Sequence, residues 1–135
     1  MLNKIQQNEG AKMETPDYYL PIMPYLIVEK ANEFIEFIKE VFGAEEKLIA
    51  PREDGTIMHA EFSLGKATIM FAAANETYKS FPCGMFVLRE DVDTVYHKAL
   101  ARGAVSLQEL GEHGYGRSGG FQDKSGNQWW VTKLD

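Results

Sequence analysis

One order of predicted elements occurs twice in this chain, and it constrains the fold more than any other feature. Lys30–Phe42 and Asp91–Arg102 place apolar residues at spacings of three and four, which is typical of helices with one buried face. A Gly-Ala pair follows each helix. One strand is predicted before each helix and another after its Gly-Ala pair. The interval from the first strand to the glycine is the same in both halves, so we interpret the chain as two βαβββ modules. Such modules predict an α+β domain with helices on one side of a mixed sheet.

A β-hairpin is predicted at Asp54–Phe71. Its first strand alternates with a period of two, so His59 and Glu61 project side by side from one face while the opposite face is apolar. Gly65 supplies the turn. Two interpretations of the polar pair stay open. It either faces a ligand as an acid–base pair, or it forms a hydrogen-bonded pair on a half-solvated sheet face.

The remaining segments complete the two modules. Strands are predicted at 22–28, 45–50, 85–89, 105–109 and 128–133, and Gly111–Gly120 is predicted to be a glycine-rich loop. Residues 1–16 are polar and aperiodic, and we expect a disordered leader there. Residues 17–135 are then a single domain, with modules at about 22–73 and 83–133.

Part of the glycine-rich loop, Gly114–Gly119, matches the dinucleotide-binding pattern GxGxxG. We exclude that function because the pattern requires a strand before it and a helix after it, and here a turn and a strand follow. Arg117 in this loop can instead pair with a ligand carboxylate or phosphate. Alternatively, Arg117 pairs with Asp123 or Glu112. Tyr115 of the same loop is expected to contact a ligand.

Composition limits the partners and the location. A net charge of −6 and a pI near 5.1 argue against binding to nucleic acid or to anionic membranes. Cys83 is the single cysteine, which excludes an intrachain disulfide and a cysteine-rich zinc site. No apolar run is long enough to span a bilayer, and the first residues lack the apolar core of a signal peptide. A cytoplasmic location is therefore predicted.

Three segments carry a resemblance to a known family: PYLIVEKANEFIEFIKEVFGAEE, HAEFSLGKATIMF and YGRSGGFQDKSGNQWWVTK. With the order of elements, they resemble the glyoxalase/bleomycin-resistance/dioxygenase superfamily, also called vicinal oxygen chelate proteins, and its PhnB-like branch in particular. The resemblance implies two tandem βαβββ modules that form a curved mixed sheet around a cleft, commonly completed in a homodimer. The cleft holds a small molecule, and in the enzymes of the family it also holds a divalent metal.

The resemblance also places the family's metal ligands on this chain. The four matching positions are Met23, Met70, Gly84 and Trp130. A thioether suits soft ions, and glycine and indole offer no ligand for a hard divalent cation. No cofactor is therefore expected. The alternative is a divalent metal held by other residues, to which a neighbour such as Gln128 would add one weak ligand.

The leading functional hypothesis is a metal-free protein that binds an apolar or aromatic small molecule. The residues expected to line its ligand site are Tyr25, Met70, Tyr115, Arg117, Gln128 and Trp130. One alternative is a lyase or isomerase, either metal-dependent or using His59 and Glu61 as acid and base. A second alternative is a protein-interaction module in which packed side chains close the cleft. Whether the chain is an enzyme stays open at this point.

Overall fold

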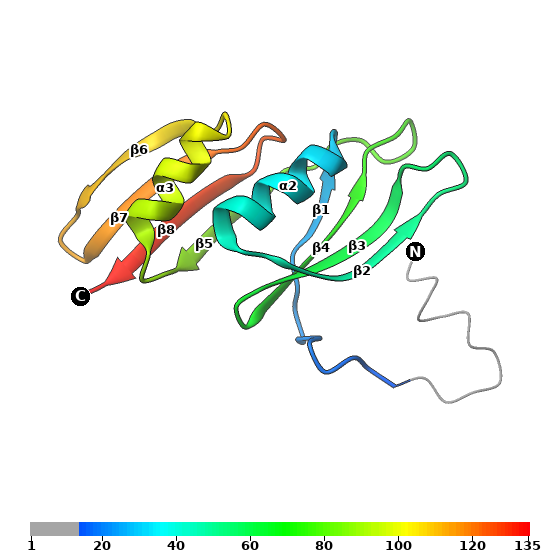
Figure 1. The fold of residues 1–135 in the computed structure, drawn as a ribbon, viewed down its shortest axis with the longest axis horizontal. Helices are drawn as coiled ribbons and strands as arrows, with labels where there is room; N and C mark the ends of the chain where they lie inside the picture. The colour runs from blue at the N-terminus through cyan, green and yellow to red at the C-terminus, as the bar shows by residue number, and fades with distance from the viewer. Residues whose placement is uncertain (1–13) are drawn as a thin grey trace. The chain divides into compact units, whose positions relative to one another are not determined.

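The computed structural model describes residues 14–135, and the expected leader over residues 1–16 lies mostly outside the described residues. The chain divides into two compact units. The first comprises the described residues up to Ala31 together with Ala44–Ser80, and the second comprises Asn32–Gly43 together with Phe81–Asp135. Each unit contains one four-stranded sheet (Figure 1).

The first unit is a mixed sheet with the strand order β1-β4-β3-β2. Its strands are β1 (Tyr25–Val28), β2 (Glu45–Pro51), β3 (Ile57–Leu64) and β4 (Ala67–Ala73). β1 runs parallel to β4, whereas β3 is antiparallel to both of its neighbours. Pro24 immediately precedes β1 at the edge of the sheet, a position where its missing N–H breaks no ladder.

The β3–β4 hairpin has the register that the alternation predicts. Phe62 and Phe71 lie on one face, where both are fully buried with ring centroids 5.6 Å apart. On the opposite face, Glu61 pairs with Met70, and Met70 pairs in turn with Tyr25 of β1. One row of side chains therefore crosses three strands and carries a tyrosine, a methionine and a carboxylate.

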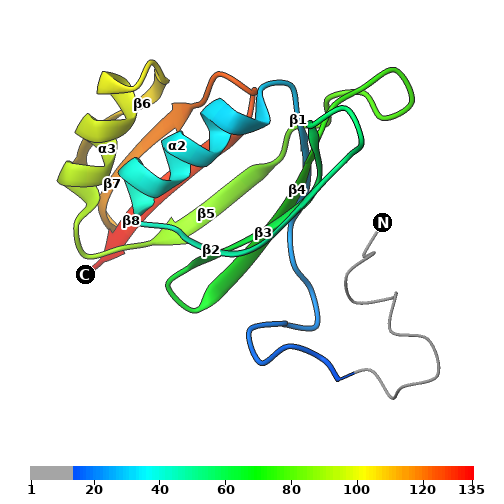
Figure 2. The same cartoon turned by 45° about the vertical axis from the view of Figure 1, so that its right-hand side comes forward.

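The second unit is a mixed sheet with the strand order β5-β8-β7-β6, covered on one face by two helices (Figure 2). Its elements are α2 (Ala31–Phe42), β5 (Gly84–Leu88), α3 (Val92–Ala101), β6 (Val105–Glu112), β7 (Gly116–Gln122) and β8 (Gln128–Leu134). Phe42 of α2 packs on Trp129 at 4.6 Å between ring centroids, and Tyr96 of α3 packs on Phe121. Helix α2, which belongs to the first βαβββ module in sequence, therefore packs in the core of the second unit.

The α+β class and the two βαβββ modules are confirmed, with the strands divided between two mixed sheets. The predicted loop over Gly111–Gly120 is wrong, because β6 continues to Glu112 and β7 begins at Gly116. Two glycines in β7 lie against aromatic rings on opposite faces of the sheet. A Cβ at Gly119 would lie 2.7 Å from Tyr96, and one at Gly120 would lie 2.4 Å from Trp130. Close ring packing, not loop flexibility, accounts for these glycines.

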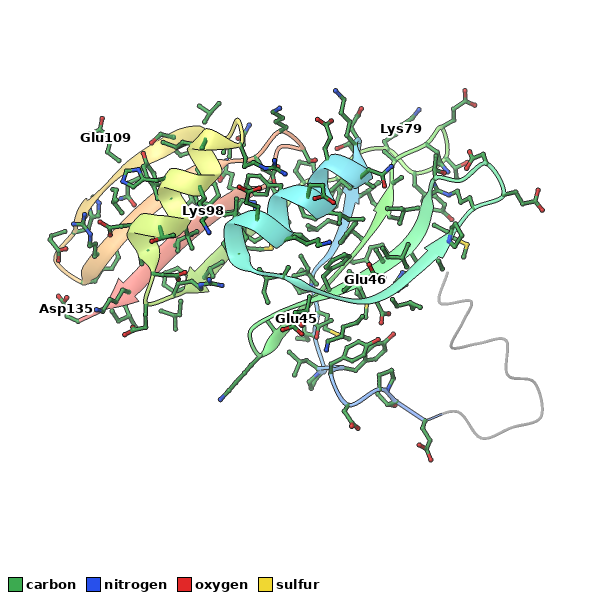
Figure 3. All side chains as sticks on the ribbon, in the orientation of Figure 1. Glu45, Glu46, Lys79, Lys98, Glu109 and Asp135 are labelled. Atoms are coloured by element: carbon green, nitrogen blue, oxygen red, sulfur yellow. The ribbon has the colours of Figure 1, made fainter. Side chains whose placement is uncertain are left out.

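Charged side chains cover the outer surfaces of both units. Glu45 and Glu46 project from β2, while Lys98 and Glu109 project from α3 and β6 (Figure 3). Neither helix of the described chain is long and apolar enough to cross a membrane.

Gly119→Ala tests the ring packing in the second unit. The new methyl group would overlap the Tyr96 ring, whose hydroxyl is hydrogen-bonded to Ser106 and cannot move away freely. We expect the free energy of unfolding in urea to fall by about 1–3 kcal/mol. Gly84→Ala is the matched control, because a Cβ there meets no atom within 4 Å. Equal stability of the two variants would contradict this packing.

Candidate functional site

The predicted polar pair on β3 comes together in the first unit. His59 Nε2 lies 2.8 Å from Glu61 Oε2, and the two side chains project from the same face. Their exposed fractions are 1% and 0%, so both are removed from solvent. The pair is therefore an internal one, and a ligand would have to reach it through the side chains that cover it.

Two tyrosines of the segment before β1 cover the carboxylate. The Tyr18 hydroxyl donates to Glu61 Oε1 at 2.6 Å, and the Tyr19 hydroxyl donates to Glu61 Oε2 at 2.5 Å. Thr68 of β4 donates to the Tyr18 carbonyl at 2.6 Å and so anchors the segment to the sheet. The Lys47 ammonium lies 5.8 Å from the centre of the Tyr18 ring, a cation–π contact.

These donors set the charge of the site. Burial alone would raise the pKa of Glu61, but hydrogen bonds from Tyr18, Tyr19 and His59 outweigh it and hold that pKa below its ordinary value. Burial raises the pKa of both tyrosines, and the Glu61 charge raises it further. The site is thus a buried carboxylate held by neutral phenol groups.

Tyr25 of β1 extends the network on its other side. Its hydroxyl lies 3.0 Å from His59 Nδ1, and the two ring centroids are 5.5 Å apart. Tyr25 is partly exposed, whereas its strand neighbour Met70 is buried. Of the expected ligand-site residues in this unit, Tyr25 is the partly exposed one and Met70 packs beside it.

In the second unit, Trp130 projects from the sheet face opposite the helices. It occupies one row with Phe86 and Gly120, and its six-membered ring lies over Gly120. Phe86 and Leu88 on the same face are 60% and 59% exposed. We call this surface the Trp130 face, defined by Phe86, Leu88, Gly120 and Trp130. Trp129 points the opposite way into the helix-covered core, as the alternation predicts.

The remaining predicted site residues are dispersed over the second unit. Arg117 pairs with both oxygens of Asp93, at 2.6 and 2.9 Å, and with Glu112 at 3.2 Å. Its guanidinium is therefore already neutralised by carboxylates, one of them a partner that the sequence suggested. Tyr115 is half exposed and Gln128 is exposed. Their ligand roles stay predictions.

The residues that the structure describes do not fit a divalent metal. Between residues 14 and 135, no three His, Cys, Asp or Glu side chains are grouped as ligands. His59 Nε2 and both Glu61 oxygens are committed to the internal network. Of the positions matched to the family's ligands, Met70 is buried and Gly84 and Trp130 offer no hard donor.

Sequence reasoning missed Tyr18 and Tyr19. They lie in a short aperiodic segment between two prolines, for which no strand or helix was predicted. The only signal is the adjacent pair of aromatic residues, and such a pair does not identify its hydrogen-bond partners.

Glu61→Gln tests the charge of the network through its pH dependence. Because folding lowers the pKa of Glu61, the stability it contributes is present above the unfolded-chain value of about 4.3 and is lost as the pH falls through the folded value. We expect Glu61→Gln to lower the free energy of unfolding by about 1–3 kcal/mol at pH 7, and the difference from the wild type to shrink towards pH 3. Urea unfolding across this range measures it.

The control for this experiment is Glu53→Gln, which makes the same charge change at an exposed turn. Its stability should follow the wild type at every pH. A Glu61→Gln curve that runs parallel to the wild-type curve would contradict the assigned carboxylate.

Comparisons with known proteins agree with this architecture. Residues 17–131 match the family model of the Glyoxalase/Bleomycin resistance protein/Dioxygenase superfamily. An uncharacterised protein of Mycobacterium bovis is 26% identical over 120 residues, which cover 80% of this chain and 79% of the relative. The PhnB protein of Bacillus cereus, described as a putative 3-demethylubiquinone-9 3-methyltransferase, has a similar structure: TM-score 0.71, 28% identity, covering 85% of this chain and all of that one.

A third similar structure is TnmS3, an antibiotic-binding protein from Streptomyces sp. CB03234. It has a TM-score of 0.63 and 17% identity, and the match covers 87% of this chain and all of TnmS3. At that identity the similarity is one of fold. The family match covers most of the chain, and the fold and the sequence agree with it. This chain belongs to the glyoxalase/bleomycin resistance/dioxygenase superfamily.

Proposed function

We propose that this protein binds a planar, largely apolar small molecule on the Trp130 face without using a metal ion. The observation that carries the proposal is the placement of the Trp130 ring over the Cα of Gly120. Any residue with a side chain at position 120 would push the indole away from the sheet. The glycine therefore lets an aromatic surface lie along the sheet.

The neighbours of Trp130 suit such a ligand. Phe86 and Leu88, which lie beside the indole, are about three-fifths exposed. An apolar ligand that covered these side chains would remove apolar surface from water, which is favourable. Ser118 and Thr132 on the same face are buried and hydrogen-bonded to each other at 2.9 Å, so they present no unpaired polar group. Aromatic side chains with few polar groups are typical of sites for planar apolar ligands.

Relatives supply further support. TnmS3 is an antibiotic-binding protein with this fold, so the fold is compatible with a binding role. The donor set of the described residues, in which His59 and Glu61 are committed to each other, favours binding without a metal. The expected homodimer and the cytoplasmic location stay predictions.

Gly120→Ala tests the proposal with Nile red, a neutral planar dye whose fluorescence rises in apolar surroundings. We expect the wild type to bind the dye saturably and Gly120→Ala to bind it at least tenfold more weakly, because the new methyl group displaces the indole. A tenfold loss corresponds to about 1.4 kcal/mol, within the range for an aromatic contact at an interface. Dye titrations followed by fluorescence give the dissociation constants.

Gly84→Ala is the matched control. Gly84 lies on the same sheet face, next to Gln128, and a Cβ there meets no atom within 4 Å. It should bind the dye as the wild type does. Unchanged binding by Gly120→Ala, in a variant that urea unfolding shows to be folded, would refute the proposal.

A further inference from the structure

A chain of hydrogen bonds in the first unit leads from a buried charge to a partly exposed tyrosine. It runs from Glu61 Oε2 to His59 Nε2 at 2.8 Å, and from His59 Nδ1 to the Tyr25 hydroxyl at 3.0 Å. Glu61 and His59 are buried, and Tyr25 is partly exposed. Tyr25 is therefore the residue of this chain with the most contact with solvent.

The chemistry of the carboxylate fixes the direction of the first hydrogen bond. A carboxylate only accepts, so His59 Nε2 carries a proton and donates it to Glu61. In the neutral imidazole the other nitrogen, Nδ1, is then an acceptor. With the imidazole in that neutral form, the Tyr25 hydroxyl donates to Nδ1. Tyr18 and Tyr19 donate two further hydrogen bonds to Glu61, which favour its ionised form.

Tyr25 has unused acceptor capacity. Its proton is committed to His59, but no residue within the described chain donates to its oxygen. Burial raises the pKa of the Tyr25 hydroxyl, and the nearby Arg52 guanidinium opposes this only in part. A bound molecule that donates a hydrogen bond to Tyr25 would complete the chain.

We propose that Tyr25 binds molecules with an acidic hydroxyl group, a phenol or an enol, and passes their proton to His59. The ligand O–H bond breaks as its proton moves to the Tyr25 oxygen, while the Tyr25 proton moves to His59 Nδ1. The products are a ligand oxyanion, a neutral Tyr25 hydroxyl and an imidazolium that the Glu61 carboxylate stabilises. Every proton is accounted for, and no oxidant or further reactant is needed.

Tyr18 and Tyr19 are not connected to His59 in this way and cannot pass a proton to it. Each of their hydroxyls donates directly to Glu61, with no imidazole between them. A proton passed through either one would have to neutralise a carboxylate whose three hydrogen bonds favour its ionised form. The matched control for Tyr25 is Tyr78, an exposed tyrosine of the same unit whose side chain takes no part in this hydrogen-bond network. The inference is also independent of the Trp130 face, because it uses different residues in the other unit.

The probe is 4-nitrophenol, whose phenol and phenolate forms absorb at different wavelengths. Below the solution pKa of the probe, we expect the wild type to bind it saturably with at least a tenfold rise in the ratio of phenolate to phenol. Tyr25→Phe should lose this rise, whereas Tyr78→Phe should keep it. On binding, the ¹⁵N resonance of His59 Nδ1 should move to the value of a protonated nitrogen in the wild type and in Tyr78→Phe, but not in Tyr25→Phe.

Three results would overturn the proposal. They are the absence of a saturable phenolate signal in the wild type, its retention in Tyr25→Phe, and its equal loss in Tyr25→Phe and Tyr78→Phe. 4-Nitroanisole, which has no hydroxyl proton, should give no absorbance change with any variant. Both substitutions keep the aromatic ring, and urea unfolding confirms that each variant is folded.

Discussion

The burial of the Glu61 carboxylate is the constraint on which the rest of the first unit depends. An ionised group without contact to solvent is strongly unfavourable unless hydrogen bonds compensate for its lost hydration. Tyr18, Tyr19 and His59 supply those bonds, and they come from the segment before β1 and from β3. The carboxylate therefore ties that segment to the sheet. Removing any one donor would leave a buried charge partly unsatisfied.

In the second unit, the main constraint is that large aromatic rings pack on both faces of one sheet. Gly119 and Gly120 are adjacent, so they face opposite sides of β7 and admit the rings of Tyr96 and Trp130. On the covered face, Trp129 also donates its indole N–H to Asp123 at 2.9 Å. The indole of Trp129 is thus fixed in the core, while that of Trp130 is left on the opposite surface.

Much of the fold could be predicted from the sequence, because helices and strands with one buried face place their apolar residues at regular spacings. The helix predicted at Lys30–Phe42 is observed at Ala31–Phe42, and the β3–β4 hairpin has the predicted faces. β7 was missed because a run of glycines is typical of a loop, and the rings that require those glycines come from distant segments. The packing of α2 on the second sheet was likewise not predictable, since an apolar helix face does not specify which sheet it contacts.

The candidate site was predictable only in part. Alternation along β3 correctly brought His59 and Glu61 together, but it could not show that tyrosines close over them. Arg117 illustrates the same limit, because its charge suggested a ligand or a nearby carboxylate. The fold supplies Glu112, one of the two carboxylates expected, and adds Asp93, 24 residues away in the sequence. Local patterns give the direction of a side chain, whereas its partners depend on how distant segments meet.

The most direct test of a metal-free site is the metal content of the protein purified without an affinity tag, combined with a thermal-shift scan against Mg, Mn, Fe, Co, Ni and Zn. Because His59 and Glu61 are bound to each other and to tyrosines, we predict substoichiometric metal and no appreciable stabilisation by any of these ions. Near-stoichiometric metal, or a large rise in melting temperature with one ion, would contradict this assignment and place a metal-dependent enzyme first.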